Sequence, residues 1–161
     1  MVSIMNEALQ LKTGQNVLEV GAGSGWHAAT IAEIVAPSDV PRSEWGHIYT
    51  VEIIHDLAEF ARKNIMKSSY ADRVSIICAD GSVGYPERAP YDRILVTAAA
   101  PDVPKPIVEQ LRRGGIMLIP VGSVHLFQNL IKITKIGNGE IEKENLGGVA
   151  FVPLTGQHGQ G

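Results

Sequence analysis

The sequence has little cysteine, few aromatic residues and no long apolar run. Among its 161 residues only Cys78 is a cysteine, 6% are aromatic and 19% are charged. One cysteine can form neither an internal disulfide nor a cysteine metal cage, which favours a reducing, cytoplasmic location. No apolar stretch reaches the ~18 residues that cross a bilayer, and no basic region precedes an apolar one at the N-terminus. We therefore expect neither a membrane span nor a secretory signal.

Positive charge is also scarce. The chain has 14 Lys and Arg against 17 Asp and Glu, a formal net charge of −3, and its basic residues do not cluster. Because affinity for nucleic acid depends largely on neutralising phosphates, we expect a small molecule or another protein as partner, not nucleic acid. Hydrophobic residues make up 45% of the chain, so residues 1–161 are predicted to form a single domain with its own core.

Apolar periodicity, interrupted by glycine and proline, predicts alternating strands and helices. Helical spacing covers residues 2–11, capped by Gly14, then 28–35 and 56–66, and a helix is expected from Pro104 to Gly114–Gly115. Strand patterns cover residues 16–20, 47–52, 73–79, 91–97, 116–121, 126–136 and 141–152. The last two are joined by Gly137-Asn138-Gly139, which indicates an antiparallel hairpin. The pattern predicts an α/β fold with a mostly parallel sheet and a C-terminal antiparallel hairpin.

The same spacing predicts which side chains are buried. In the third helix, Leu57, Phe60, Ala61 and Ile65 fall on one face, which we expect to pack against the sheet. Cys78 lies in an apolar run and is expected in the core.

Four predicted parallel strands end in residues suited to a nucleoside. In an open α/β sheet, ligands bind outside the carboxyl ends of the strands, where the strand order reverses. The first strand is followed by the glycine-rich loop 21–25, whose backbone N–H groups can approach a ligand. The second ends at Glu52, which can accept two hydrogen bonds from ribose hydroxyls, the third at Asp80-Gly81 and the fourth at Thr97. The prediction depends on the ordered set, because each feature alone also occurs in ordinary turns.

The glycine spacing distinguishes between nucleoside ligands. The dinucleotide fingerprint is G-x-G-x-x-G, whereas this loop reads G-x-G-x-G and is followed by Trp26. With Glu19 two residues before its first glycine, the loop resembles the S-adenosylmethionine-binding loop of the Rossmann-like methyltransferases. This resemblance implies S-adenosyl-L-methionine as cofactor and S-adenosyl-L-homocysteine as product. It also implies that Glu52 binds the ribose and that Asp80-Gly81 lies at the adenine side.

A longer series of motifs narrows this resemblance to one family. The motifs are VLEVGAGSGWHAA at 17–29, DG-x-x-GY at 80–85, APYDRI at 89–94, AAAP at 98–101, QL-x-x-GG at 110–115, IPVG at 119–122 and VAFVPL at 149–154. Together they resemble the protein-L-isoaspartate (D-aspartate) O-methyltransferases over nearly the whole chain. The resemblance implies protein repair, in which the α-carboxyl of an L-isoaspartyl residue is methylated and the ester collapses to a succinimide that can reopen to aspartate. The implied partners are isoaspartyl-containing proteins and peptides.

The resemblance also implies the site residues. The cofactor-binding residues would be Glu19, Gly21, Ala22, Gly23, Ser24, Gly25, Glu52, Asp80, Gly81 and Thr97. The substrate-binding residues would be Ala98, Ala99, Pro101, Val149 and Phe151. The segment 149–154 is also predicted by its own pattern to be a buried strand. No metal site is predicted, because the histidines lack metal-ligand spacing, and no general base is needed for an acceptor carboxylate that is already ionised.

Members of this family carry a further N-terminal segment with a Ser/Thr-containing stretch that contacts the isoaspartyl group. The chain is therefore expected to be N-terminally truncated, with no assignable catalytic residue and with exposed apolar surface that favours self-association. Three alternatives stay open. The first is a truncated cofactor-binding fragment without turnover. The second is a small-molecule S-adenosylmethionine methyltransferase, which would share the cofactor residues but not the VAFVPL run. The third is an NAD-dependent oxidoreductase, which would need the G-x-G-x-x-G fingerprint that this loop lacks.

Overall fold

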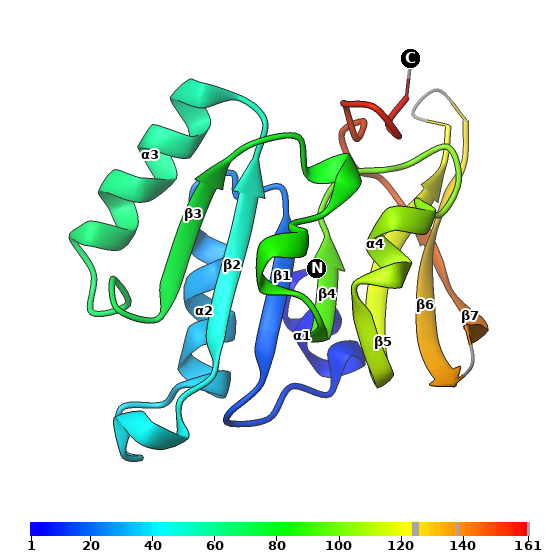
Figure 1. Ribbon diagram of the computed structural model, residues 1–161. Coiled ribbons are helices and arrows are strands. Elements are labelled where there is room, and N and C mark those ends of the chain that lie inside the picture. Colours follow the sequence, from blue (N-terminus) through cyan, green and yellow to red (C-terminus); the bar gives the residue numbers. More distant parts are fainter. Residues whose placement is uncertain (124–125, 138, 161) are drawn as a thin grey trace.

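A seven-stranded sheet forms the centre of the protein (Figure 1), in a computed structural model that describes residues 1–123, 126–137 and 139–160. Its strand order is β3-β2-β1-β4-β5-β6-β7. The strands are β1 (Asn16–Val20), β2 (His47–Glu52), β3 (Val74–Cys78), β4 (Tyr91–Val96), β5 (Leu111–Gly122), β6 (Gln128–Gly137) and β7 (Glu140–Val149). The first five strands are parallel, and β6 and β7 are antiparallel. The predicted α/β fold, with its parallel sheet and terminal hairpin, is confirmed; Asn138 of the connection lies outside the described residues.

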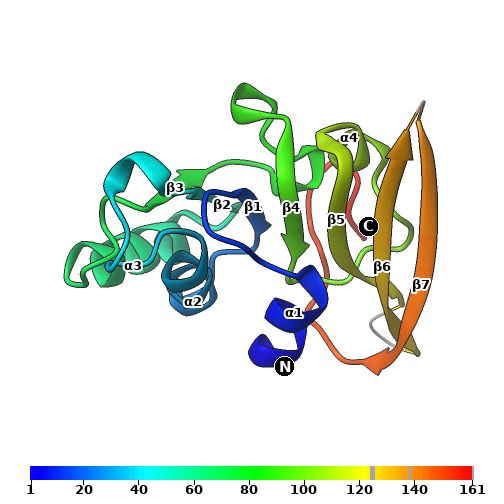
Figure 2. The same cartoon turned by 90° about the horizontal axis from the view of Figure 1, so that it is seen from below.

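Helices cover both faces of this sheet. They are α1 (Val2–Leu9), α2 (Trp26–Val35), α3 (His55–Met66) and α4 (Lys105–Glu109). Figure 2 shows α1, α2 and α3 on one side of the sheet and α4 on the other. Met5, Ile31 and Ile65 from the first three helices share one buried cluster, while Ile107 of α4 belongs to the second. Because both faces are covered, a central strand such as β1 is buried along nearly its whole length.

The strand order reverses between β1 and β4. From β1 the chain continues to β2 and β3 in one direction along the sheet, and β4 and β5 extend in the other. Val20 at the end of β1 pairs with Val51 of β2 and with Val96 of β4, so the three strands end level with one another. Their carboxyl ends therefore form the crevice in which open α/β sheets bind ligands.

Two predicted helix ends are wrong. Helix α1 ends at Leu9, and its C-cap is Gln10, in the left-handed conformation with φ 52°, instead of Gly14. Helix α4 ends at Glu109, and β5 already begins at Leu111, so Gly114–Gly115 lie inside a strand. The early end of α4 has a physical reason in Lys135 of β6. Its ammonium group donates hydrogen bonds to the carbonyl oxygens of Val108, Glu109 and Leu111. These carbonyls need no further helical turn to be satisfied.

Three burial predictions are also wrong. Leu57 and Phe60 of α3 are 39% and 51% exposed, because the helix packs on the sheet through Ala58, Ala61 and Ile65 instead. Small alanine side chains let the helix approach the strands closely, which turns the larger residues outward. Cys78 is exposed because it ends the edge strand β3.

The segment 149–154 is not a buried strand. β7 ends at Val149, and the chain then leaves the sheet, with Val152 69% exposed. Pro153 forms an isolated bridge with Ala99, so the segment crosses the end of β4 instead of extending the hairpin. Among the described residues, no helix has the length and apolar character needed to span a membrane.

Candidate cofactor and substrate site

A cavity of about 430 Å³ opens at the carboxyl ends of β1, β2 and β4. This volume lies in the range of small-molecule sites, as does the mostly apolar lining with a few polar groups. The lining residues are Val20, Gly21, Gly23, Val51, Glu52, Ile53, Ile54, Leu57, Gly81, Thr97, Ala98, Val152, Pro153, Leu154 and Thr155. The position agrees with the crevice expected at the reversal of strand order.

The glycine loop between β1 and α2 forms one wall of the cavity. Gly21, Gly23 and Gly25 all have positive φ, at 99°, 53° and 83°. A Cβ at position 21 would overlap the hydroxyl oxygen of Thr97, so only glycine fits there. A Cβ at position 23 would meet no described atom within 4 Å, which leaves the backbone open to a ligand. The loop is thus a cradle that backbone atoms line.

Glu52 ties the glycine loop to the end of β2. Its Oε2 accepts a hydrogen bond from the backbone N–H of Gly23 at 3.2 Å, and its Oε1 accepts one from the N–H of Ile54 at 3.1 Å. The side chain lines the cavity although it is only 7% exposed. Each carboxylate oxygen has two acceptor directions, so both can receive a further donor, such as a ligand hydroxyl.

The end of β4 forms the opposite wall. The hydroxyl of Thr97 lies 3.0 Å from the carbonyl oxygen of Val20 and 2.9 Å from that of Gly21, and donates to them. The next residues hold the C-terminal segment in place. The N–H of Ala99 donates to the carbonyl of Val152 at 2.8 Å, and the N–H of Leu154 donates to the carbonyl of Ala99 at 2.9 Å. Through these bonds the segment 152–155 becomes part of the cavity wall.

Asp80 is held by the C-terminal tail. Its carboxylate accepts hydrogen bonds from the backbone N–H groups of Ser82 at 2.9 Å and Gln157 at 2.8 Å. Burial raises the pKa of the carboxyl group, but the hydrogen bonds from Gln157 and Ser82 outweigh it and keep the pKa below its usual value. Asp80 does not line the cavity, whereas the following Gly81 does.

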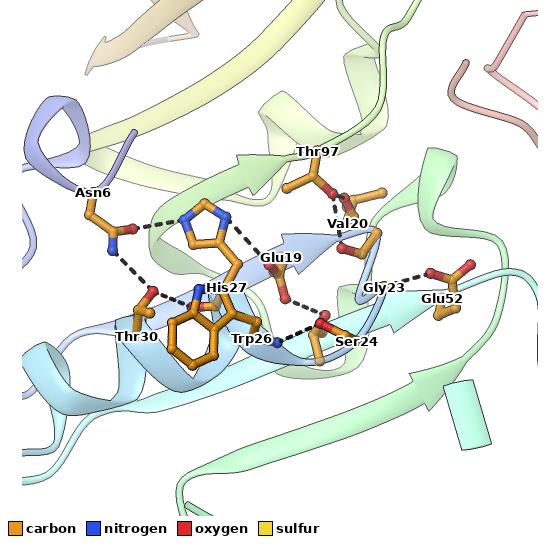
Figure 3. A network of polar contacts seen from close by, with 12 residues as sticks. Asn6, Glu19, Val20, Gly23, Ser24, Trp26, His27, Thr30, Glu52 and Thr97 are labelled. Atoms are coloured by element: carbon orange, nitrogen blue, oxygen red, sulfur yellow. Dashed lines mark hydrogen bonds and ion pairs between the residues drawn. The ribbon is translucent and has the colours of Figure 1, made fainter. Parts of the chain in front are cut away.

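Glu19 lies beneath the glycine loop (Figure 3). It does not line the cavity. It is fully buried, and its Oε2 accepts a hydrogen bond from the hydroxyl of Thr50 at 2.6 Å. On the same side, Nδ1 of His27 is 4.0 Å from its Oε1. Burial, with a smaller contribution from the charge of Glu52, raises the pKa of Glu19 to about 8 despite the bond from Thr50. Near neutral pH this carboxyl group is therefore mainly protonated.

The structure brings some of the predicted residues together at the cavity and places others around it. Those that line it are Gly21, Gly23, Glu52, Gly81, Thr97 and Ala98. Those that do not are Glu19, Ala22, Ser24, Gly25, Asp80, Ala99, Pro101, Val149 and Phe151. Phe151 is bonded to the side chain of Gln128, with its N–H donating to Oε1 at 2.7 Å and its carbonyl accepting from Nε2 at 3.0 Å.

Part of the cavity lining was not predicted from the sequence. Ile53, Ile54 and Leu57 follow Glu52 at the start of α3, and Val152 and Thr155 come from the C-terminal segment. Two adjacent isoleucines directly after a strand end were a signal for the first group, because a helix N-terminus at the surface rarely needs them. Val152 belongs to the motif 149–154, for which the family resemblance implies a wall of the peptide cleft, whereas Thr155 had no local signal, since only the fold brings it to the cavity.

Comparison with known proteins gives consistent results. The sequence model of the family described as protein-L-isoaspartate(D-aspartate) O-methyltransferase (PCMT) matches residues 1–159. A protein-L-isoaspartate O-methyltransferase of Hyperthermus butylicus is 57% identical over 159 residues, and one of Thermococcus onnurineus is 54% identical. These alignments cover 99% of this chain but 66% and 68% of the relatives, so the chain spans about two thirds of their length.

Solved structures show the same likeness. A protein-L-isoaspartate O-methyltransferase structure superposes with a TM-score of 0.87 at 28% identity, covering 98% of this chain and 47% of that one. A Plasmodium falciparum protein described as a beta-aspartate methyltransferase, in complex with S-adenosyl-L-homocysteine, gives a TM-score of 0.79 at 28% identity, covering 95% of this chain and 71% of that one.

Proposed function

Because this chain belongs to the protein-L-isoaspartate(D-aspartate) O-methyltransferase family, we propose that it transfers a methyl group from S-adenosyl-L-methionine to the α-carboxyl group of L-isoaspartyl residues in damaged proteins. The products are S-adenosyl-L-homocysteine and a methyl ester. The ester collapses to a succinimide that can reopen to a normal aspartyl residue. The proposed role is therefore protein repair, with isoaspartyl proteins and peptides as partners.

One structural observation carries the proposal. At the end of two adjacent parallel strands, an open glycine loop and the carboxylate of Glu52 face the same cavity. The residues fit an S-adenosyl nucleoside, because Gly23 leaves space for close backbone approach and Glu52 keeps acceptor directions for ribose hydroxyls. Ile53, Ile54 and Leu57 supply the apolar surface that a purine ring needs.

The proposed cofactor site comprises both lining and supporting residues. Its members are Gly21, Ala22, Gly23, Ser24, Gly25, Glu52, Asp80, Gly81 and Thr97, with Glu19 beneath the loop. Ala22 and Ser24 shape the turn, and Asp80 fixes the start of the short helix η2 (Gly81–Val83) through its bond to Ser82.

The acceptor side is proposed to lie at the end of β4. Ala98 lines the cavity, and Ala99 holds the wall segment 152–155 through its backbone. Phe151 leads the chain into this wall, and Pro101 and Val149 stay predicted acceptor contacts.

When bound, S-adenosyl-L-methionine supplies an electrophilic sulfonium methyl group, which a carboxylate oxygen of the acceptor takes by in-line displacement while the sulfur keeps the electron pair of the broken carbon–sulfur bond. The chain's own residues orient the reactants. The Thr97 hydroxyl proton is directed at two backbone carbonyls, so this side chain positions the loop and does not act as a base. Val152 and Leu154 present apolar side chains to the cavity. Holding the reacting atoms in line at ~3–3.5 Å then lowers the barrier by several kcal/mol.

The direct test is transfer of labelled methyl from S-adenosyl-L-methionine to two short peptides that differ only in an isoaspartyl or aspartyl linkage. We expect transfer to the isoaspartyl peptide alone, and loss of transfer in Glu52→Ala but not in Glu44→Ala, an exposed glutamate away from the cavity. Transfer to neither peptide with cofactor binding intact would identify a binding fragment without turnover. Transfer to small acids alone would identify a small-molecule methyltransferase, and NAD binding in competition would overturn the cofactor assignment.

The proposal extends to the setting of the enzyme. We place one methyltransferase domain over residues 1–161, in the cytoplasm, where a lone exposed thiol such as Cys78 stays reduced. Self-association is proposed through exposed apolar side chains, among them Ile54 and Val152 at the cavity and Phe60 on α3. A monomeric sizing profile across a wide concentration range would contradict that last point.

A further inference from the structure

A chain of polar contacts passes beneath the glycine loop, on the side of β1 that faces α1 and α2 (Figure 3). The Asn6 amide of α1 donates to Oγ1 of Thr30 at 3.1 Å, and its Oδ1 is 2.9 Å from Nε2 of His27. Nδ1 of His27 is 4.0 Å from Oε1 of Glu19, whose Oε2 accepts from Thr50. None of these residues lines the cavity described above.

The hydrogen positions in this chain follow from its geometry. The hydroxyl of Thr30 donates its only proton to the carbonyl oxygen of His27 at 2.7 Å, so its oxygen must accept from Asn6. The Asn6 amide therefore presents its oxygen to His27, and Nε2 of His27 carries the ring proton. This leaves the lone pair of Nδ1 directed at Glu19.

The atom that faces this lone pair has no donor of its own. Within the part of the chain that the structure describes, Oε1 of Glu19 is buried without a hydrogen-bond partner. Two buried lone pairs that face each other repel, whereas one proton between them makes a hydrogen bond once the side chains close the 4.0 Å gap. A buried unpaired acceptor is costly, so the protonated form of the pair is favoured.

The charges around the pair support the same conclusion. Burial raises the pKa of Glu19 to about 8, and the negative charge of Glu52 on β2 adds to this shift while Thr50 opposes it. Burial lowers the pKa of His27 to about 4, and the amino group of Met1 on the side of α1 adds to this shift. Both side chains are thus uncharged near neutral pH, which leaves the carboxyl proton of Glu19 to serve the pair.

The two residues stand at opposite ends of the glycine loop. Glu19 is two residues before Gly21, and His27 is two residues after Gly25. We infer that Glu19 and His27 hold one proton between them, and that this pair, braced by Asn6, positions both ends of the glycine loop for cofactor binding. Glu19, His27 and Asn6 are then positioning residues, and they act on the cofactor only through the loop. The inference rests on the proposed function, because it takes the loop as the cofactor site.

Binding of S-adenosyl-L-homocysteine by calorimetry, from about pH 6 to about pH 9.5, tests the effect on the loop. This ligand carries no sulfonium charge, so ionisation of Glu19 does not attract it electrostatically through the sulfur. In Glu19→Gln the amide is a permanent donor to His27 and an acceptor for Thr50. We expect the affinity of the unchanged protein to fall, relative to Glu19→Gln, by about fivefold or more as pH rises. Taking the ratio cancels the titration of the ligand's own amino group.

Two outcomes would overturn this inference. A ratio that stays constant with pH would show that no proton of Glu19 controls the loop. A ratio that changes in the opposite direction, with Glu19→Gln losing affinity relative to the unchanged protein as pH rises, would show that the ionised carboxylate favours binding. His47→Gln is the matched control, because His47 is another half-buried histidine, bonded to Ser75 at the far end of β2. It should keep the profile of the unchanged protein.

The proton itself can be observed without any ligand. In the unchanged protein with ¹⁵N-labelled histidine, NMR should show that the ring proton of His27 is on Nε2. The chemical shift of Nδ1 should change as pH passes the pKa of Glu19, and this change should be absent in Glu19→Gln. A proton on Nδ1, or an ordinary histidine titration, would contradict the inference. If these signals appear but neither the unchanged protein nor its variants bind S-adenosyl-L-homocysteine, the proposed function is wrong while the proton-sharing pair stands.

Discussion

Two glutamates on neighbouring strands, Glu19 of β1 and Glu52 of β2, differ in their surroundings although both are nearly inaccessible. Glu52 receives two backbone N–H groups, one to each oxygen, and lines the cavity. Glu19 receives a single hydroxyl and lies on the opposite side of the loop. Burial alone therefore does not determine the protonation state of a buried carboxyl group. The donors that face it decide whether it serves as an acceptor or needs a proton of its own.

The largest expected effect is on the pH dependence of stability. The folded-state pKa of Glu19, about 8, is above the unfolded value of 4.5, so the folded state binds the extra proton between these limits. The free energy of unfolding should therefore fall as pH rises from 4.5 to about 8, by about 1.4 kcal/mol per pH unit from this group. Urea unfolding across this range measures it.

Glu19→Gln is the matched test of that slope. Its amide does not titrate, so the variant should gain stability relative to the unchanged protein as pH rises. Parallel stability curves for the two proteins would show that Glu19 has the same proton affinity folded and unfolded, and the contrast with Glu52 would then be lost.

The next largest effect concerns the loop that separates the two glutamates. Gly21→Ala should destabilise the protein by about 2–4 kcal/mol and abolish cofactor binding, because its Cβ would overlap the Thr97 hydroxyl at φ 99°. Gly23→Ala is the control, since it has open space and should cost only ~1–2 kcal/mol for its left-handed backbone. Adding Thr97→Ala to Gly21→Ala should restore part of the stability. Equal losses in the two single variants would exclude the steric explanation.

A smaller effect is expected for Glu52→Gln. One end of the amide becomes an N–H donor, which can accept neither the backbone N–H that it faces, at Gly23 or at Ile54, nor a ribose hydroxyl of the cofactor. We therefore expect cofactor affinity to fall by about 1.5–3 kcal/mol. Calorimetry with S-adenosyl-L-homocysteine measures this loss. For Glu19→Gln we expect no such loss of affinity, because its amide can donate to His27 and accept from Thr50. Similar losses of affinity in both variants would show that both carboxylates meet the ligand.

The smallest effect is expected for Thr50→Val. This change removes the Thr50 hydroxyl, which donates to Glu19 and opposes the rise in the pKa of that carboxyl group. Loss of this hydrogen bond should cost about 1–2 kcal/mol of stability. The pH midpoint of the stability change should move upward, since the carboxylate loses its donor. Thr134→Val on β6 offers a control at a site away from this pair. An unmoved midpoint would mean that Thr50 does not stabilise the ionised form.

Much of the fold was predictable because local patterns are strong in its first half. The bounds of β1 and β2 were predicted to the residue, since each is a short strand-like run that ends before a glycine or at a charged residue. The end of α4 was not predictable, because Lys135, which satisfies its last carbonyls, comes from a strand far along the chain. The exposure of Phe60 was equally hidden, since the alanine face of α3 competes with the larger residues for the sheet.

By itself, the sequence determined the strand-loop-helix order, the glycine loop and the resemblance to a methyltransferase family, because these depend on residues that are neighbours in the chain. Only the tertiary structure decided that Glu19 and Glu52 lie on opposite sides of the loop, and that the C-terminal segment 152–155 completes the cavity. Side chains on a strand alternate between its faces, and which face meets a helix or a ligand depends on packing between distant segments. That packing assigns a buried proton to one glutamate and a place at the cavity to the other.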